Sequence, residues 1–382
     1  MTSQEQFRQR IHQVKRIVLK VGSRLLVDQH NQPCPERINA LVAEIAEFKN
    51  QGIQVILVSS GAIAAGMSVL GMHKRPKTLP DLQAAAATGQ SRLMSMYESA
   101  CREFGFHSAQ LLLTSADVND RKRHLNCLNC VNALLKRNVL PIVNENDCIS
   151  VQEICFGEND HLASLVGVMT KSEMTVLLTS TDGMYHRNSS GVLGDRLSVI
   201  DEIDDHVKKM AEGTDGNELS TGGMASKLEA AEQVLACGDD MWIIEGTDFT
   251  NLSRLRAGED IGTYFPATQQ KMKSNKRWLT FFSEVKGKLV IDDGAVTALI
   301  ENGKSLLPSG ISFVEGQFLK GDVLDIVDAK GTVVARGSTN YSSNEALLVK
   351  GKQTDELETT LGKEFYNVVI HRDNMVILQA ND

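Results

Sequence analysis

The chain has 382 residues with 40 basic and 48 acidic side chains, a formal net charge of −8, and only 5% aromatic residues. This composition argues against a protein that binds nucleic acid mainly through phosphate contacts. No apolar run approaches the roughly 20 residues of a membrane span, and Met1–Arg10 is too polar for a secretory signal. The length predicts two or three domains with large cores, and we expect a cytoplasmic protein.

Histidines and cysteines do not point to metal or nucleophile chemistry. The nine histidines show neither zinc-ligand spacing nor a partner pattern for a catalytic triad. Seven scattered cysteines, an odd number, predict reduced thiols. Cys127 and Cys130 form a lone C-x-x-C motif inside an apolar, helix-periodic stretch, so we interpret them as structural. We therefore expect no metal site built from protein ligands.

The first predicted element is a strand over 16–21 that contains a lysine. Lys20 interrupts an apolar run and is followed closely by the turn residue Gly22. A lysine is costly to bury without a partner, so it lies either on an edge strand or beside a ligand. In parallel α/β sheets, ligands collect outside the carboxyl ends of the strands, where Lys20 would lie.

The second predicted strand, 53–58, runs into a turn of small residues and then a helix. Gly61 and Gly66 have the spacing of a Walker A loop, but Met67 and Ser68 stand where that loop requires Lys and Ser/Thr. No G-x-G-x-x-G follows the strand either, so a Rossmann nucleotide site is not supported. What remains is bare backbone with two serine hydroxyls, which suits a small anionic ligand.

Two acidic, amide-rich turns come next. A strand over 139–143 runs into the Asn-Glu-Asn-Asp loop 144–147, and Gly-Glu-Asn-Asp at 157–160 precedes an apolar helix over 160–171. Asn159 or Asp160 can simply be the N-cap of that helix. Alternatively, the two turns form a pocket for an ammonium group and its carboxylate.

A pair of glycines, 222 and 223, precedes a helix predicted over 223–237 with Lys227 in its first turn. A helix N-terminus offers free N–H groups and the positive end of a dipole, which suits phosphate. Taken alone, such a segment is usually a helix with a glycine-rich entry and a solvated lysine.

The order of elements predicts a doubly wound, mainly parallel α/β sheet between helices, followed by a small β-barrel. The sheet strands are expected at 16–21, 53–58, 139–143, 175–179 and 241–245, and the helices near 36–50, 81–104, 124–138, 160–171 and 223–237. The polar segment 269–277 predicts a boundary between domains at 1–270 and 280–382. In the barrel, short strands and glycine turns are expected to follow one another at 287–291, 307–311, 320–327 and 333–337.

Six segments, in this order, resemble the amino-acid kinase family over nearly the whole chain: Lys20–Ser23, Ser60–Gly66, Ala86–Ser91, Asn144–Asp147, Gly157–Asp160 and Thr221–Met224. The resemblance implies that ATP phosphorylates the γ-carboxylate of L-glutamate to glutamyl 5-phosphate, the first step of proline synthesis. The loops 144–147 and 157–160, with the barrel, favour glutamate over aspartate, acetylglutamate, carbamate and uridylate, which other members phosphorylate.

The resemblance also assigns roles by position. Lys20 and Lys227 would be catalytic, flanking the transferring phosphoryl group. ATP would contact Lys20, Gly22, Thr179, Ser180, Thr221, Gly222, Gly223, Met224, Ala225, Ser226 and Lys227. Glutamate would contact Ser60, Gly61, Ala62, Asn144, Asp147, Glu158, Asn159 and Asp160. Two positions depart from the family pattern, since Ser180 and Glu158 stand where aspartates are usual.

The expected chemistry fits these residue types. The glutamate side chain has a pKa near 4.3 and is ionised at neutral pH, so no general base is needed. The difficulty is to stabilise charge on the phosphoryl oxygens, which calls for lysines, N–H groups and Mg²⁺ that arrives with ATP. The resemblance further implies feedback inhibition by proline, a homo-oligomer (dimer or tetramer) and a glutamate-5-phosphate reductase downstream.

The C-terminal part is similar to the PUA domain, which is best known from RNA-modifying enzymes. This similarity raises the alternative of an RNA-binding protein. Across 286–363, however, eleven acidic side chains outnumber nine basic ones, whereas RNA-binding modules usually present a basic face. We therefore do not expect RNA as a partner, although a local basic patch can escape such an average.

Overall fold

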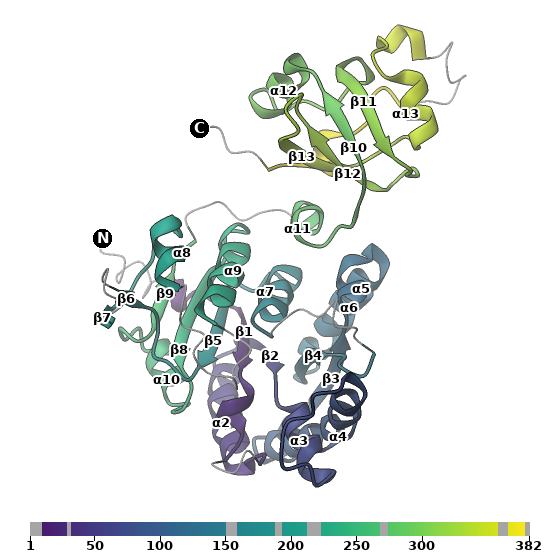
Figure 1. Ribbon diagram of the computed structural model, residues 1–382. Coiled ribbons are helices and arrows are strands. Elements are labelled where there is room, and N and C mark those ends of the chain that lie inside the picture. The colour runs from purple at the N-terminus through teal and green to yellow at the C-terminus, as the bar shows by residue number, and fades with distance from the viewer. Residues whose placement is uncertain are drawn as a thin grey trace. The chain divides into compact units, whose positions relative to one another are not determined.

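The computed structural model describes residues 10–28, 32–149, 159–187, 193–211, 223–267, 274–357 and 366–378. The chain divides into two compact units (Figure 1). Unit 1 comprises Met1–Val118 and Lys122–Met272, and unit 2 comprises Asn119–Arg121 and Lys273–Asp382. Within the described part of the chain, none of the helices has the length and apolar character that a bilayer span needs.

Unit 1 is built on a seven-stranded sheet in the order β3-β4-β2-β1-β5-β8-β9. All neighbouring strands are parallel except β8 and β9, which are antiparallel. The strands are β1 (Arg16–Val21), β2 (Gln54–Ser59), β3 (Ser108–Leu113), β4 (Leu140–Glu145), β5 (Met174–Thr179), β8 (Asp240–Glu245) and β9 (Thr263–Phe265). The predicted α/β fold class is thus confirmed. A separate hairpin pairs β6 (Tyr185–Arg187) with β7 (Leu193–Arg196).

Helices cover both faces of this sheet. The longer ones are α2 (Pro35–Asn50), α3 (Ala62–Val69), α4 (Leu79–Glu103), α6 (Arg121–Lys136), α7 (Asn159–Thr170) and α9 (Met224–Leu235). Shorter ones are η1 (Ser23–Leu26), α5 (Ser115–Asn119), α8 (Asp205–Ala211) and α10 (Asn251–Arg256). Ile17 and Leu19 of β1 share one apolar core with α2 and α4. Because side chains alternate along a strand, Lys20 points to the opposite face, where α7 contacts β1.

Helices α3 and α4 pack through two glycines. A Cβ atom on Gly66 would lie 1.7 Å from the carbonyl oxygen of Ala85, and one on Gly89 would lie 1.8 Å from that of Ala62. These distances are far below contact, so only glycine permits the two backbones to approach so closely. The contact places the first residue of α3 directly against α4.

Unit 2 contains a five-stranded sheet in the order β11-β10-β12-β13-β14 around its own apolar core. The strands are β10 (Val285–Ile291), β11 (Ile311–Gly316), β12 (Val323–Val327), β13 (Val333–Ser338) and β14 (Met375–Ile377). The helices are α11 (Ser274–Phe281), α12 (Asp293–Ile300), α13 (Ser343–Val349) and the single turns η2 (Pro308–Gly310), η3 (Thr354–Glu356) and η4 (Arg372–Asn374).

Among the short strands and glycine turns predicted for the barrel, the segment 307–311 is mostly the turn η2, and the strand β11 starts only at Ile311. Pro308 explains the difference, because its fixed φ angle favours the first turn of a helix and it has no N–H for a sheet.

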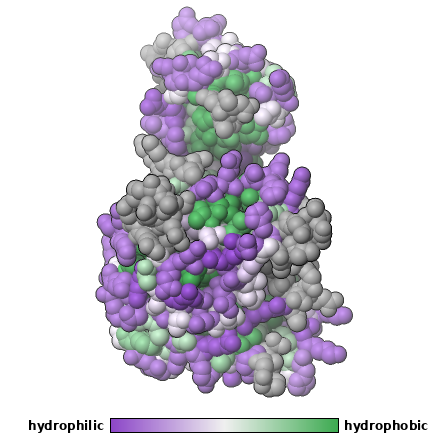
Figure 2. Space-filling model, turned by 90° about the vertical axis from the view of Figure 1, so that its left-hand side faces the viewer, coloured by the Kyte–Doolittle hydropathy of each residue, from purple (hydrophilic) through white to green (hydrophobic). Residues whose placement is uncertain are grey.

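In both units apolar side chains are largely buried. The face drawn in Figure 2 is accordingly mainly hydrophilic, with apolar residues gathered in small patches.

Candidate functional site

The carboxyl ends of β1, β2, β4 and β5 meet at one edge of the sheet. Val21 lies opposite Ser59 of β2 and Leu178 of β5, while Asn144 stands near the end of β4. The chain adds β2 to β4 on one side of β1 and then crosses to β5 on the other. The crevice at such a switch in strand order is the usual ligand site of an open α/β sheet.

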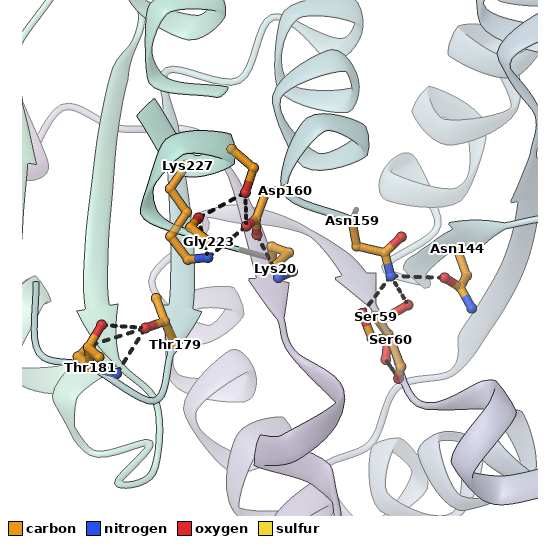
Figure 3. Close-up of polar contacts among 11 residues, drawn as sticks. Lys20, Ser59, Ser60, Asn144, Asn159, Asp160, Thr179, Thr181, Gly223 and Lys227 are labelled. Carbon is orange, nitrogen blue, oxygen red and sulfur yellow. Dashed lines mark hydrogen bonds and ion pairs between the residues drawn. The ribbon is translucent and has the colours of Figure 1, made fainter. Parts of the chain in front are cut away.

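At this edge, two lysines share one buried carboxylate (Figure 3). Lys20 Nζ of β1 lies 2.5 Å from Asp160 Oδ1, and Lys227 Nζ of α9 lies 2.9 Å from Asp160 Oδ2. The Asp160 side chain is fully buried, whereas 12% of the Lys20 side chain and 9% of the Lys227 side chain remain exposed. Three elements far apart in sequence therefore converge on one charged centre.

The charge of this centre follows from its composition. Burial alone would raise the pKa of Asp160, but the two lysine ammonium groups outweigh it and hold that pKa below its usual value. Asp160 is therefore ionised and contacts two ammonium groups, so among these three side chains the cations outnumber the anion by one. Both lysine side chains keep a small exposed fraction, which suits the approach of an anionic ligand such as a phosphate.

A second cluster, made of amides and hydroxyls, lies beside the first. Asn159 Nδ2 donates to Ser59 O at 3.1 Å, to Ser60 Oγ at 2.6 Å and to Asn144 Oδ1 at 3.1 Å (Figure 3). Asn144 Nδ2 in turn donates to Gln90 Oε1 of α4 at 3.1 Å. The Asn159 side chain is thus fixed by three acceptors. Its own carbonyl oxygen makes no hydrogen bond with the described residues and can accept one from a ligand.

Helix α7 joins the two clusters. Its first two residues, Asn159 and Asp160, turn to different partners, one to the amide cluster and one to the lysines (Figure 3). The positive end of the helix dipole adds to the attraction for anions at this point. The sequence groups Asp160 with the substrate residues, whereas its side chain in the structure contacts Lys20 and Lys227.

The turn after β2 completes the amide side of the site. Gly61 has a φ angle of +106°, a left-handed conformation that favours glycine, and Ala62 starts α3. Ser60 N donates to Val21 O at 3.2 Å, which holds the turn against the end of β1. Gly22 also belongs to this edge, since a Cβ atom there would lie 4.0 Å from Lys20 Nζ.

Asp147 follows β4 and is partly buried. Burial raises the pKa of Asp147 to about 6, nearby Glu145 adds to that rise, and Arg75 offsets only part of it. Within the described residues, the Asp147 carboxylate makes no hydrogen bond or ion pair. An ammonium group bound beside it would restore its charge, so Asp147 is suited to recognise a cation.

The predicted nucleotide residues lie on the lysine side. The Gly223 carbonyl accepts from Lys227 Nζ at 3.3 Å and from Ser226 Oγ at 3.0 Å, and Met224 and Ala225 open helix α9. Thr179 ends β5, where its hydroxyl accepts from Thr181 N at 2.9 Å, and Ser180 lies within that turn. Of the remaining predicted residues, Glu158, Thr221 and Gly222 lie outside the described residues.

Two polar residues of the site, Gln90 and Tyr97, were not assigned a role from the sequence, and Ser59 was predicted only as one of the two hydroxyls in the turn after the second strand. Gln90 is buried and fixes Asn144, while Ser59 Oγ lies 2.8 Å from the buried Tyr97 hydroxyl. A polar residue at a buried helix position is a weak signal, because its partner can lie anywhere in the chain. Among the described residues, no group of three His, Cys, Asp or Glu side chains is arranged to hold a metal ion.

Known protein families match both parts of the chain, and single relatives match nearly its whole length. The profile of the amino acid kinase family matches residues 15–245, and that of the PUA domain matches residues 287–361. A glutamate 5-kinase from Caldanaerobacter subterraneus subsp. tengcongensis is 42% identical, covering 96% of this chain and 99% of that protein. Glutamate 5-kinases from Syntrophotalea carbinolica and Moorella thermoacetica are 41% and 40% identical, with 96% of this chain and 98% and 97% of those proteins covered.

Proposed function

The chain belongs to the amino acid kinase family, and we propose that it acts as a glutamate 5-kinase. In this reaction ATP phosphorylates the γ-carboxylate of L-glutamate and yields L-glutamyl 5-phosphate, the first step of proline synthesis from glutamate. The observation that carries the proposal is the start of α7. Consecutive residues there, Asn159 and Asp160, connect a cluster suited to an amino acid with a cationic centre suited to phosphate.

On the amide side, the residues would bind and orient glutamate. Asp147 pairs with the α-ammonium group, while Ser60, Asn144 and Asn159 supply hydrogen bonds. The turn at Gly61 and Ala62 presents backbone close to the ligand, and Glu158 belongs to the same set of predicted contacts. An amino acid held this way directs its side-chain carboxylate toward the lysines. Such fixed placement is a large part of catalysis in phosphoryl transfer.

On the cationic side, Lys20 and Lys227 would stabilise the charge that spreads over the phosphoryl oxygens. One γ-carboxylate oxygen of glutamate forms a bond to the terminal phosphorus of ATP. The bond from that phosphorus to the β–γ bridging oxygen breaks, and ADP leaves with its electron pair. No proton moves, because the attacking carboxylate is already ionised. Asp160 holds both lysines in place without being consumed.

The nucleotide would lie along Gly22, Thr179, Ser180 and the start of α9, including Gly223 to Lys227. Lysine ammonium groups and a glycine-rich helix entry are donors, which suit phosphate oxygens rather than a bare metal ion. We therefore write the cosubstrate as magnesium–ATP, whose Mg²⁺ neutralises phosphate charge and is held by the nucleotide and water.

Several further features belong to this proposal. Proline would inhibit by competing at the glutamate pocket, because it shares the α-carboxylate and a cationic nitrogen. The active form would be a homo-oligomer, and the product would pass to a glutamate-5-phosphate reductase. Residues 1–270 would form the catalytic domain and 280–382 the PUA-like domain. A cytoplasmic location is supported by the six described cysteines, all of which are free thiols.

The test is an amino-acid panel with ATP, Mg²⁺ and hydroxylamine, which traps an acyl phosphate as a hydroxamate. We expect L-glutamate to give hydroxamate in proportion to ADP, whereas aspartate and N-acetylglutamate give at most background. Carbamate and UMP are tested in parallel by ADP release. Preferred turnover of any of these other acceptors would overturn the proposed substrate and leave the kinase family unaffected.

A further inference from the structure

A hydrogen-bonded set of three partly or fully buried side chains connects α7 to α9. Ser164 Oγ lies 2.6 Å from Gln233 Oε1 and 2.7 Å from the His161 carbonyl oxygen. Gln233 Nε2 lies 3.1 Å from His161 Nδ1. Ser164 is fully buried, and His161 and Gln233 are half-buried. We call Ser164, His161 and Gln233 the α7–α9 latch.

The direction of each bond can be assigned from chemistry. Burial lowers the pKa of His161, so its ring is neutral at neutral pH, even though Glu229 and Gln233 act in the opposite sense. A neutral ring can accept at Nδ1, and the Gln233 amide nitrogen can only donate. The Ser164 hydroxyl has one proton, which the carbonyl oxygens of Gln233 and His161 share as acceptors. Both the oxygen and the nitrogen of the Gln233 amide on α9 therefore form hydrogen bonds with side chains of α7.

The latch lies close to the charged centre in sequence as well as in space. His161 directly follows Asp160, and Gln233 lies on the same 12-residue helix as Lys227. At its start, α9 also contacts α7 through Lys227 and Ser226, which lie 2.9 and 3.5 Å from Asp160 Oδ2. Beyond that point its buried side chains, Leu228, Ala231 and Val234, are apolar. Apolar packing is not directional, so it does not by itself fix how far a helix slides or turns. Hydrogen bonds at both ends of an amide do fix it.

We propose that Gln233, held by His161 and Ser164, is a positioning residue that sets the location of Lys227 against Asp160 and Lys20 during phosphoryl transfer. The inference rests on the proposed kinase function. Gln233 itself touches neither substrate in this scheme. It acts through Lys227, because a shift of α9 by about 1 Å moves the ammonium group away from the transferring phosphoryl and can cost up to about 10²-fold in rate.

The test compares kcat and KM of the full-length native protein with those of Gln233→Met, which keeps the side-chain length and helix preference but forms no latch. We expect kcat to fall by about tenfold while the KM for glutamate changes by less than twofold, because the amide cluster is attached to α7, β2 and β4. Glu232→Ala is the matched control. Its side chain is on the same helix and pairs with Lys208 at 2.7 Å, outside the latch, so its kcat should stay within twofold of native.

A double-mutant cycle with His161→Ala separates positioning from general loosening of the fold. If the two residues act as one unit, the double variant loses no more kcat than the worse single variant. A native-like kcat for Gln233→Met, or a loss matched by Glu232→Ala, would overturn the inference. So would a loss that appears only in the glutamate KM. If the native protein turns over no glutamate, the proposed function fails first, and that outcome is distinct from all of these.

Discussion

At the scale of single residues, one carboxylate determines how two lysines can act. Without Asp160, two ammonium groups at this distance from a common point would repel each other. With it, both are held by ion pairs of 2.5 and 2.9 Å to the same carboxylate. A centre whose cations are already in place loses little free energy to reorganisation when charge develops on the phosphoryl group.

The first prediction concerns these lysines. Lys20→Ala or Lys227→Ala should lower kcat by about 10²–10³, because each removes a full charge from the transition state. The KM for glutamate should change little, because the amide cluster is left intact. Lys208→Ala, which removes an exposed lysine paired with Glu232 on the surface, serves as the control and should leave kcat unchanged. A lysine variant that retains near-native kcat would remove that lysine from the mechanism.

The second prediction concerns pH and Asp147. Its pKa in the free protein is about 6, so it is ionised at pH 7.5 and largely neutral at pH 5. An ammonium group needs the ionised form, so the KM for glutamate should rise as pH falls below about 6 and stay constant above 7. Asp147→Asn should raise the glutamate KM strongly, remove this pH dependence and leave the KM for ATP nearly unchanged. A shift mainly in the ATP constant would show that the two half-sites are reversed.

The third prediction follows from the same rise in the pKa of Asp147. The folded-state pKa of Asp147 lies above the ordinary aspartate value of 3.8, so this residue lowers the free energy of unfolding as pH rises from about 4 to 6. Asp147→Asn should therefore stabilise the ligand-free protein at pH 7 by about 1–2 kcal/mol, after allowance for partial exposure. Urea unfolding with and without glutamate measures this. An Asn variant less stable than native would indicate a structural role for the carboxylate.

At the scale of elements, the contact between α3 and α4 holds in place the turn at Gly61 and Ala62, which we propose contacts glutamate. Gly89→Ala would put a methyl group against the carbonyl oxygen of Ala62. Ala62 is the first residue of α3 and directly follows Gly61. We expect a loss of about 3 kcal/mol in unfolding free energy and a higher glutamate KM, because relief of the clash moves the turn. Ser95→Ala, on the exposed side of α4, is the control for helix substitution. A Gly89→Ala protein with native stability and KM would show that the turn is fixed by other contacts.

Much of unit 1 could be predicted from sequence because its central strands are continuous apolar runs and its long helices are periodic. β1, β2, β4, β5 and β8 were expected within one or two residues of their observed bounds. The edge strands β3 and β9 were not, since β3 is partly exposed and β9 has only three residues. Such strands carry no clear pattern of their own, and pairing with a neighbour determines them.

The site could be predicted in part for a similar reason. Glycine turns and lysines at strand or helix ends are local signals, and these indicated residues that the structure brings together at one edge of the sheet. Partnerships between distant residues are not local. The bond between Asn144 and Gln90 spans 54 positions, and the pairing of Asp160 with two lysines depends on how α7 and α9 pack. No spacing in the sequence distinguishes an Asp160 that contacts substrate from one that holds lysines.

At the scale of the whole molecule, the described site residues all precede Ala230 and belong to unit 1. Unit 2 has its own sheet and core. We therefore predict that a chain ending near Lys273 folds and still forms hydroxamate, since a domain with its own core usually stands alone. Circular dichroism and the trapping assay measure this. A truncated chain that folds but is inactive would show that the PUA-like part completes the site.

The same division yields a prediction about RNA. Because acidic residues outnumber basic ones across 286–363, the isolated fragment 280–382 should not retain structured RNA at physiological salt. Filter binding at two salt concentrations tests this. Tight binding that weakens steeply with salt would revive an RNA-directed role for this part of the protein.

The most direct test of the account is to follow the attacking oxygen. Glutamate carrying ¹⁸O in both γ-carboxylate positions is incubated with ATP, Mg²⁺, hydroxylamine and the protein, and the inorganic phosphate released is analysed by mass spectrometry. Attack by the γ-carboxylate leaves a glutamate oxygen bridging to phosphorus, and hydroxylamine then cleaves the acyl carbon–oxygen bond. If the γ-carboxylate attacks ATP, each phosphate released carries one ¹⁸O. Unlabelled phosphate would mean that water rather than glutamate attacks ATP, and would contradict the proposed reaction.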